Sequence, residues 1–280
     1  MPDMSNLSSM PIALIGGGNM ARGLIGGLLA KGAAPSRICV AEPNESARAS
    51  LVNDFNIRVT PDNTAAVSGA RVVILAVKPQ LMAEVARALA PALQATRPLV
   101  ISVAAGIRAD RLQRWIGPET RIVRCMPNRP ALIGAGATGL YAAGLSPADR
   151  ALAEQVLSTT GVCMWVTSED EIDAVTALSG SGPAYFFRLA ELMAEAGIAQ
   201  GLDPEVARRL SAQTLAGAGQ LVAAEKSPDL ARMRAEVTSK GGTTEAALNS
   251  FAAQGFDRLV ADAMAAAARR SRELSEQFGG

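Results

Sequence analysis

Short apolar segments alternate with segments of helical periodicity through roughly the first 166 residues. The segment 71–77 is apolar at every position after Arg71, which is typical of a central parallel strand buried on both faces. Eight strands are predicted, over residues 12–15, 37–42, 58–60, 71–77, 98–103, 121–126, 138–142 and 163–166. Helices are predicted between most of them, at 20–31, 45–54, 63–67, from Pro79 onward and at 147–160. Such alternation predicts a doubly wound α/β sheet.

The pattern changes near residue 170, and no strand is predicted beyond it. Asp203-Pro204-Glu205 combines a capping residue, a proline at the first helical position and an acid in the first turn. Ser227-Pro228-Asp229 repeats this signal, and the apolar stripe is rich in Ala with Leu and Met. The sequence therefore predicts an all-α second domain, and its apolar face favours pairing with a second subunit.

Composition and charge exclude several classes of function. Hydrophobic residues make up 49% of the chain but aromatic residues only 4%, so the core must be aliphatic, which favours α/β or helical packing. The net charge of +1, without long charged runs, gives no reason to expect nucleic acid or a membrane surface as partner. The chain has no histidine, which excludes Ser-His-Asp, Cys-His and His-based zinc chemistry.

The cysteines and the start of the chain bear on location. Cys39, Cys125 and Cys163 lack metal-ligand spacing, so we expect no metal site and a reducing compartment. The first nine residues are polar and lack the features of a signal peptide, and no apolar run reaches the ~18 residues of a membrane helix. We expect a soluble protein in the cytoplasm.

A glycine-rich turn follows the first strand. Gly16, Gly18 and Ala21 fit the G-x-G-x-x-G/A pattern that binds dinucleotides. Gly16 would make the tight turn, Gly18 would let the backbone approach a pyrophosphate, and the helix N-terminus would face the phosphates. We therefore expect a disordered tail over residues 1–9, a Rossmann-like dinucleotide-binding domain over 10–166 and the helical domain over 167–280.

Polar or small residues follow several predicted strands and should gather at one edge of the sheet, where ligands bind. Glu42 ends the second strand about 20 residues after the glycine turn, where an acid binds a ribose hydroxyl. A solvated loop carboxylate is the alternative for Glu42. Lys78, Ala105 and Asn128 follow the later strands.

Two polar, glycine-rich stretches interrupt the helical half, at 178–185 and 237–245. In the second, Gly241 and Gly242 free the backbone, and Thr243 and Thr244 stand at the start of a helix. Successive N–H groups in such a turn can hold a carboxylate. The alternative for either stretch is an ordinary helix-capping turn.

These motifs together resemble the pyrroline-5-carboxylate reductases, the enzymes of the last step of proline synthesis. The resemblance extends from Ile12 to about Ser275. It rests on the segments 15–21, 76–80, 104–106, 126–128, 178–185 and, most specifically, Val-Thr-Ser-Lys-Gly-Gly-Thr-Thr at 237–244. It implies a hydride transfer from a nicotinamide cofactor to the C=N bond of 1-pyrroline-5-carboxylate, giving L-proline. It also implies a homodimer built on the helical domain, in some members assembled into rings of dimers.

The resemblance also implies which residues form the site. The substrate would be held by the loop of the partner subunit, with Thr244 near the ring nitrogen as the catalytic residue. The substrate-binding residues would be Ser239, Lys240, Gly241, Gly242, Thr243 and Thr244. The cofactor-binding residues would be Gly16, Gly18, Asn19, Met20, Glu42, Asn44, Asn63, Ala76, Val77, Lys78, Pro79, Ala104, Ala105, Gly106 and Asn128.

The chemistry suits a chain without histidine, because a protonated cyclic imine is already a strong hydride acceptor. The protein must bring the nicotinamide to the C=N carbon and fix the carboxylate. A threonine hydroxyl at a helix start could relay or stabilise the proton on nitrogen.

The sequence does not decide which cofactor is preferred or what Arg129 does in the nicotinamide pocket. The charge of Glu42 favours NADH, because a carboxylate repels a 2′-phosphate. The resemblance favours NADPH, with Asn44 and Arg48 as candidates for binding that phosphate, and we expect NADP(H) with NAD(H) as the alternative. Arg129 stands where the family commonly has Thr, and it either reaches a carboxylate or points to solvent.

Three other functions compete with this reading. A related imine or keto-acid reductase of the 6-phosphogluconate dehydrogenase-like group would need a catalytic Lys or His in the helical domain, where Lys240 is the candidate and no His occurs. A non-catalytic NADP-binding regulatory protein would lack an intact 237–244 loop. A helical interaction module with a vestigial first domain would lack the coherent motifs at the strand ends.

Overall fold

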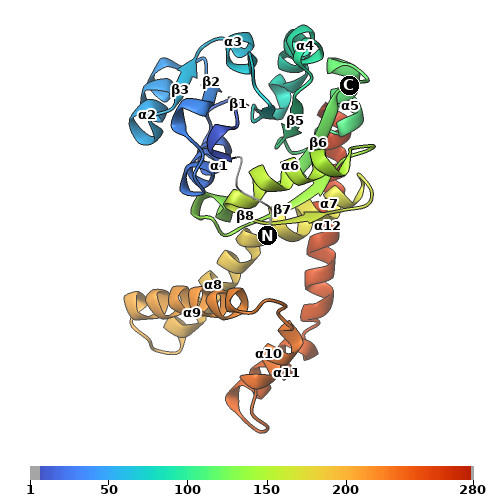
Figure 1. Cartoon of the computed structure of the whole chain (residues 1–280). Helices are drawn as coiled ribbons and strands as arrows, with labels where there is room; N and C mark the ends of the chain where they lie inside the picture. Colours follow the sequence, from blue (N-terminus) through green and yellow to red (C-terminus); the bar gives the residue numbers. More distant parts are fainter. Residues whose placement is uncertain (1–6, 279–280) are drawn as a thin grey trace. The chain divides into compact units, whose positions relative to one another are not determined.

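The computed structural model describes residues 7–278, and its largest feature is an eight-stranded sheet (Figure 1). The strand order is β3-β2-β1-β4-β5-β6-β7-β8, and all neighbours are parallel except the antiparallel pair β6 and β7. The strands are β1 (Ile12–Ile15), β2 (Ile38–Ala41), β3 (Arg58–Thr60), β4 (Val72–Leu75), β5 (Leu99–Ser102), β6 (Arg121–Met126), β7 (Gly136–Tyr141) and β8 (Gly161–Trp165). Each lies where the apolar pattern predicts a strand, so the predicted doubly wound sheet is confirmed.

Helices cover both faces of the sheet. Successive residues of each strand point to opposite faces, and both sets are apolar, so both faces need a covering layer. Ile12 and Leu14 belong to one buried cluster, together with Leu24 of α1. Ala13 and Ile15 belong to the other cluster, on the opposite face. The helices of this half are α1 (Asn19–Ala30), α2 (Glu45–Phe55), α3 (Asn63–Val67), α4 (Pro79–Thr96), α5 (Ala109–Ile116) and α6 (Pro147–Leu157).

The first compact unit contains the sheet and is larger than the predicted first domain. It comprises residues 1–181 together with 267–280, and the second unit comprises 182–266. The first unit therefore includes α7 (Glu171–Val175), the π-helix Thr176–Gly180 and the last part of α12. The predicted limits at 166 and 167 stay a prediction, since compactness alone does not define a domain that folds by itself.

Part of the expected disordered tail over residues 1–9 is ordered. Leu7–Ser9 form a 3-10 helix, and Leu7 is fully buried within the cluster on one face of the sheet. Residues 1–6 lie outside the described residues. The prediction of disorder rested on the polar residues of the segment 1–9 and overlooked Leu7, whose buried side chain holds residues 7–9 in place.

The second unit is entirely helical. It contains α8 (Gly182–Ala199), α9 (Pro204–Ala224), α10 (Leu230–Glu236), α11 (Thr243–Ala253) and the first part of α12 (Phe256–Phe278). The side chain of Asp203 caps α9 by accepting from Glu205 and Val206, and Asp229 caps α10 in the same way. The predicted start of α9 is therefore confirmed, whereas α10 begins two residues later than predicted, with Asp229 in place of Ser227 as its cap.

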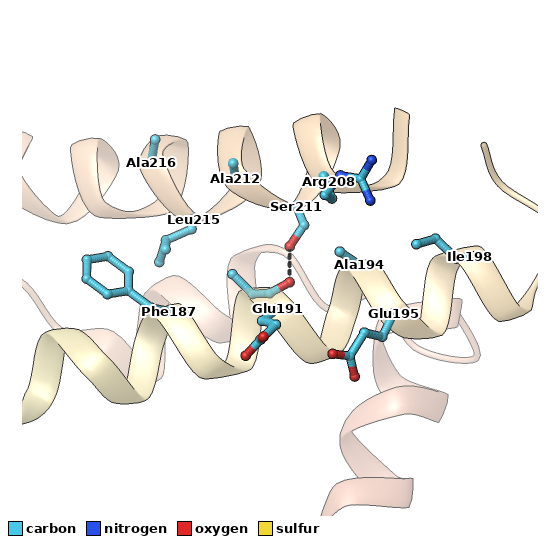
Figure 2. A pocket seen from close by; sticks show the side chains of 11 residues that line it. Phe187, Glu191, Ala194, Glu195, Ile198, Arg208, Ser211, Ala212, Leu215 and Ala216 are labelled. Atoms are coloured by element: carbon cyan, nitrogen blue, oxygen red, sulfur yellow. Dashed lines mark hydrogen bonds between the residues drawn. The ribbon is translucent and has the colours of Figure 1, made fainter. Parts of the chain in front are cut away.

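A groove of about 750 Å³ lies between α8 and α9 (Figure 2). Its lining is mostly apolar, with Phe187, Ile198 and Leu215 on its two sides. The Ser211 hydroxyl donates to the Ala190 carbonyl at 2.5 Å and ties the two helices together. Phe186, Phe187 and Leu210 are each more than half exposed, so this unit leaves a large apolar surface uncovered within one chain.

No helix among residues 7–278 is long and apolar enough to cross a membrane.

Candidate functional site

The carboxyl ends of β1 and β4 meet at the glycine turn, where the strand order reverses direction. Gly16 donates to the Ala41 carbonyl at 2.8 Å, and Ala76 donates to the Ile15 carbonyl at 2.8 Å. Gly16 has φ of 99°, and a Cβ there would lie 2.8 Å from the Ala76 oxygen. Only glycine allows this approach, so the turn brings two predicted cofactor segments together.

Gly18 presents an open backbone surface at the start of α1. A Cβ on Gly18 would have no atom within 4 Å, and no side chain caps this end of the helix. Asn19 is exposed and Met20 is half-buried. The free N–H groups of the first turn thus face open space beside a backbone without a side chain, which fits a pyrophosphate.

Glu42 directly follows β2, as predicted, but both of its carboxylate oxygens accept backbone hydrogen bonds. Oε2 accepts from Gly17 N at 3.0 Å, and Oε1 accepts from Asn44 N at 3.0 Å. The carboxylate therefore fastens the glycine turn to the start of α2. It lies beside the turn that would hold a dinucleotide, and it is more than a solvated loop residue.

The two candidates for a 2′-phosphate are also engaged in local hydrogen bonds. The Asn44 side chain caps α2 by accepting from Ala47 N at 2.9 Å. The Arg48 guanidinium donates to the carbonyls of Glu42 and Pro43, both at 2.8 Å. Asn44 is exposed and Arg48 is half-buried, so both groups lie at the rim of this edge.

The segment after β4 brings a cation to the same edge. Lys78 is exposed and precedes Pro79, which is the first residue of α4 as predicted. Ala76 and Val77 are half-buried beside the Gly16 turn. Asn63 is the first residue of α3, which Asp62 caps by accepting from Thr64 N at 2.8 Å.

The loop 103–108 joins β5 to α5 and contains three of the predicted cofactor residues. Ala104 is buried and Ala105 is exposed, while Gly106 has φ of 75°. The side chains at 104–106 are small, as predicted for a loop beside a flat ring.

Asn128 is buried, and its side-chain amide donates one hydrogen bond and accepts another. Nδ2 donates to the Ser179 carbonyl at 3.0 Å, and Oδ1 accepts from Ala137 N at 2.9 Å. It therefore joins β7 to the π-helix. Arg129 is exposed and forms no ion pair within residues 7–278.

The predicted substrate loop belongs to the second unit and forms a tight turn before α11. Gly242 N donates to the Ser239 carbonyl at 3.0 Å, and Gly241 has φ of 73°, as the third residue of a type II turn requires. A carboxylate already accepts from this turn, because Glu245 Oε2 accepts from Gly241 N at 2.7 Å. Lys240 is exposed, and Thr244 is half-buried at the second position of α11.

Two features near the cofactor edge were missed by the sequence patterns. The stretch 178–185 begins in a π-helix in place of the expected turn, with the Ser179 hydroxyl donating to the Val175 carbonyl at 3.1 Å. A buried ion pair joins Arg124 of β6 to Glu169 at 3.1 Å. Arg124 lies within a predicted strand, and Glu169 follows another. Nothing in their spacing along the sequence indicates that the two side chains form an ion pair.

The cysteine thiols offer no alternative nucleophile. Burial raises the pKa of Cys163 to about 12 and also raises that of Cys125. Both thiols therefore stay protonated at neutral pH.

The sheet order and the open glycine turn define a dinucleotide-binding protein of the Rossmann class. The pyrroline-5-carboxylate reductase of Pseudomonas aeruginosa is 50% identical to it, over 98% of this chain and 100% of the relative. That of Haemophilus influenzae is 44% identical over 95% of this chain and 98% of the relative. The chain belongs to the pyrroline-5-carboxylate reductase family.

Domain-level matches agree with this assignment. Residues 169–274 match the family of pyrroline-5-carboxylate reductase dimerisation domains, and residues 11–106 match the coenzyme F420-dependent NADP oxidoreductases. A pyrroline-5-carboxylate reductase structure from Coxiella burnetii has a TM-score of 0.91 at 40% identity, covering 95% of this chain and 98% of that one. One from Plasmodium falciparum with NADP bound shares the fold, with a TM-score of 0.80 at 24% identity over 96% of this chain and 99% of that one.

The resemblance predicted from the sequence is thus confirmed, as are the two-part fold class and the assignment to the oxidoreductases. The roles of the individual site residues stay predictions.

Proposed function

We propose that this protein reduces 1-pyrroline-5-carboxylate to L-proline at the edge formed by the glycine turn, the 103–108 loop and Asn128. The observation that carries the proposal is the pairing of an open dinucleotide turn at Gly18 with an intact 237–244 loop in one chain. A bound reduced nicotinamide would supply the hydride, which adds to the C=N carbon while the ring nitrogen keeps its proton.

The residues of the chain bind and orient both molecules. The N–H groups of Asn19 and Met20 face the pyrophosphate, and Ala76 to Pro79 line the same edge. The loop around Ala104 and the backbone near Asn128 border the nicotinamide. The buried Asn128 amide fixes this segment through Ser179 and Ala137, so its part in cofactor binding is to shape the backbone.

The substrate is held by the 239–244 loop. The N–H groups at the start of α11 and the Thr243 hydroxyl bind the substrate carboxylate, because a helix N-terminus favours an anion. The Thr244 hydroxyl stabilises or relays the proton on the imine nitrogen. Gly241 N already donates to Glu245, so the N–H groups that bind the substrate carboxylate are those of α11 itself.

NADPH is the proposed cofactor, with NADH as the alternative. The matches to NADP oxidoreductases and to an NADP-bound relative favour NADPH. Glu42 opposes it by charge, although two backbone hydrogen bonds already partly offset that charge. Arg48, whose guanidinium donates to the Glu42 carbonyl, supplies a compensating cation beside this turn.

The functional assembly is a homodimer, formed through the second unit. The match of residues 169–274 to a dimerisation family and the uncovered apolar groove between α8 and α9 support it (Figure 2). Rings of dimers and the cytoplasmic location stay predictions from the sequence.

The decisive experiment is the oxidation of NADPH by the purified protein with 1-pyrroline-5-carboxylate, repeated with NADH. Turnover with formation of proline is expected. A protein that binds NADPH but reduces neither this imine nor related imines would instead be a regulatory NADP-binding protein. Turnover only with other imines or keto acids would indicate the related reductase group.

A further inference from the structure

A charged pair lies buried behind the proposed nicotinamide edge. Arg124 is 2% exposed and Glu169 is 7% exposed, and Arg124 Nη1 lies 3.1 Å from Glu169 Oε1. Replacing a buried ion pair by apolar residues of similar volume often leaves the stability of a protein unchanged or raises it. A contribution to stability therefore does not explain why this pair is present.

The same carboxylate oxygen fixes the end of the 103–108 loop. Glu169 Oε1 accepts from Ala109 N at 2.5 Å, and Ala109 is the first residue of α5. Arg108 adds a second contact, with Nη2 at 3.6 Å from Glu169 Oε2. Glu169 thus ties the turn before α7 to the loop that contains Ala104 to Gly106.

Arg124 extends this link to the neighbouring strand. It lies on β6 opposite Ser102 of β5, and β6 continues through Met126 toward Asn128. One oxygen atom of Glu169 therefore joins the two segments that border the proposed nicotinamide position.

The C-terminal part of α12 also packs against this loop. A Cβ on Gly106 would lie 3.2 Å from Phe278 and 3.3 Å from the backbone of Leu274. Ser271 holds this part of α12 in place by donating to the buried Asp173 at 2.6 Å. The loop is therefore supported by α12 as well as by Glu169.

We propose that Glu169 is a positioning residue for hydride transfer, which holds the end of the 103–108 loop in place by accepting from Ala109 N. This rests on the proposed function, because it needs the nicotinamide at that loop. The oxygen that accepts from Ala109 N is the essential feature, and Arg124 balances the charge of the buried carboxylate. A loop released from Ala109 N would leave the adenosine end bound and misplace the ring, which lowers the rate of the chemical step more than affinity.

The test compares two charge-neutral double variants, Arg124→Met/Glu169→Gln and Arg124→Met/Glu169→Leu. Neither leaves a buried unpaired charge, and they differ only in whether residue 169 can accept from Ala109 N. At saturating NADPH and 1-pyrroline-5-carboxylate, the Gln variant should keep kcat within about threefold of wild type. The Leu variant should lose at least about tenfold, while NADPH affinity by fluorescence titration changes by less than about threefold in both.

A single variant, Glu169→Asp, guards against failure of the double variants to fold. It keeps the charge opposite Arg124 but shortens the reach to Ala109 N by one methylene, so a loss of kcat is again expected. Equal kcat in the Gln and Leu variants, or wild-type kcat in Glu169→Asp, would overturn the positioning role. Absence of imine reduction by the wild-type protein would instead overturn the proposed function.

Discussion

The surroundings of Thr244 follow only in part from the sequence. The glycines before it and the helix after it were predicted, and α11 does begin at Thr243 with Gly242 as its cap. The bond from Gly241 N to Glu245 was not predicted, because a glutamate four residues away is equally compatible with an ordinary first-turn acid. Similarly, the position of Glu42 after β2 followed from the pattern, whereas its bond to Gly17 depends on the tertiary fold.

Replacing Thr244 by Val tests its proposed role in proton transfer. The shape is kept but the hydroxyl is lost, and kcat/KM for 1-pyrroline-5-carboxylate should fall at least about tenfold with NADPH affinity unchanged. Steady-state kinetics and a cofactor titration measure both. Thr243→Val is the matched control for a residue that only binds the carboxylate, and it should raise KM with little change in kcat. Wild-type turnover in Thr244→Val would mean that this hydroxyl takes no part in the chemistry.

Replacing Glu42 by Gln tests how its charge affects cofactor choice. Gln keeps an oxygen that accepts from Gly17 N but removes the repulsion of a 2′-phosphate. The ratio of NADPH to NADH affinity should therefore rise, by about three- to tenfold for a half-buried charge. Glu45→Gln, one residue into α2 and exposed, is the control and should leave the ratio unchanged. An unchanged ratio in Glu42→Gln would place the carboxylate away from the adenosine ribose.

At the scale of whole elements, the strands were predicted well because they are buried on both faces and therefore apolar along their length. The π-helix over Thr176–Gly180 was not predicted, since the sequence Ser-Gly-Ser-Gly-Pro reads as a turn. The return of α12 to the first unit was also missed. Its periodic pattern continues without interruption to Phe278. Such a pattern does not indicate which compact unit each turn of the helix packs against.

Packing of α1 against the 3-10 helix Ser158–Thr160 depends on Gly27. A Cβ at Gly27 would lie 2.7 Å from the Thr159 carbonyl oxygen, so the backbone would have to move. Gly27→Ala should therefore lower the free energy of unfolding by about 1–2 kcal/mol, after the gain in helix propensity is subtracted. Gly26→Ala on the same helix meets only Phe55 at 3.8 Å and should be neutral or stabilising. Denaturant unfolding of both variants measures the difference, and equal stability would show that the helix shifts at little cost.

At the scale of the whole molecule, one chain leaves its second unit incomplete. Apolar side chains on α8 and α9 are more than half exposed, and the groove between these helices has no covering segment among residues 7–278. The cofactor edge, by contrast, is built within the first unit alone. Substrate turnover should therefore depend on a dimer formed through the second unit. Cofactor binding should not depend on it.

Ala216→Glu separates these two effects. Ala216 is exposed on α9 and lines the groove, so a carboxylate there leaves the single chain folded but must be buried unpaired when a partner covers it (Figure 2). Sedimentation should reveal a monomer that binds NADPH with wild-type affinity and has lost most of its reductase activity, if the partner supplies the substrate loop as the family resemblance implies. Ala216→Ser, which adds only a small hydroxyl, should remain dimeric and active. A fully active monomer would show that each chain completes its own site.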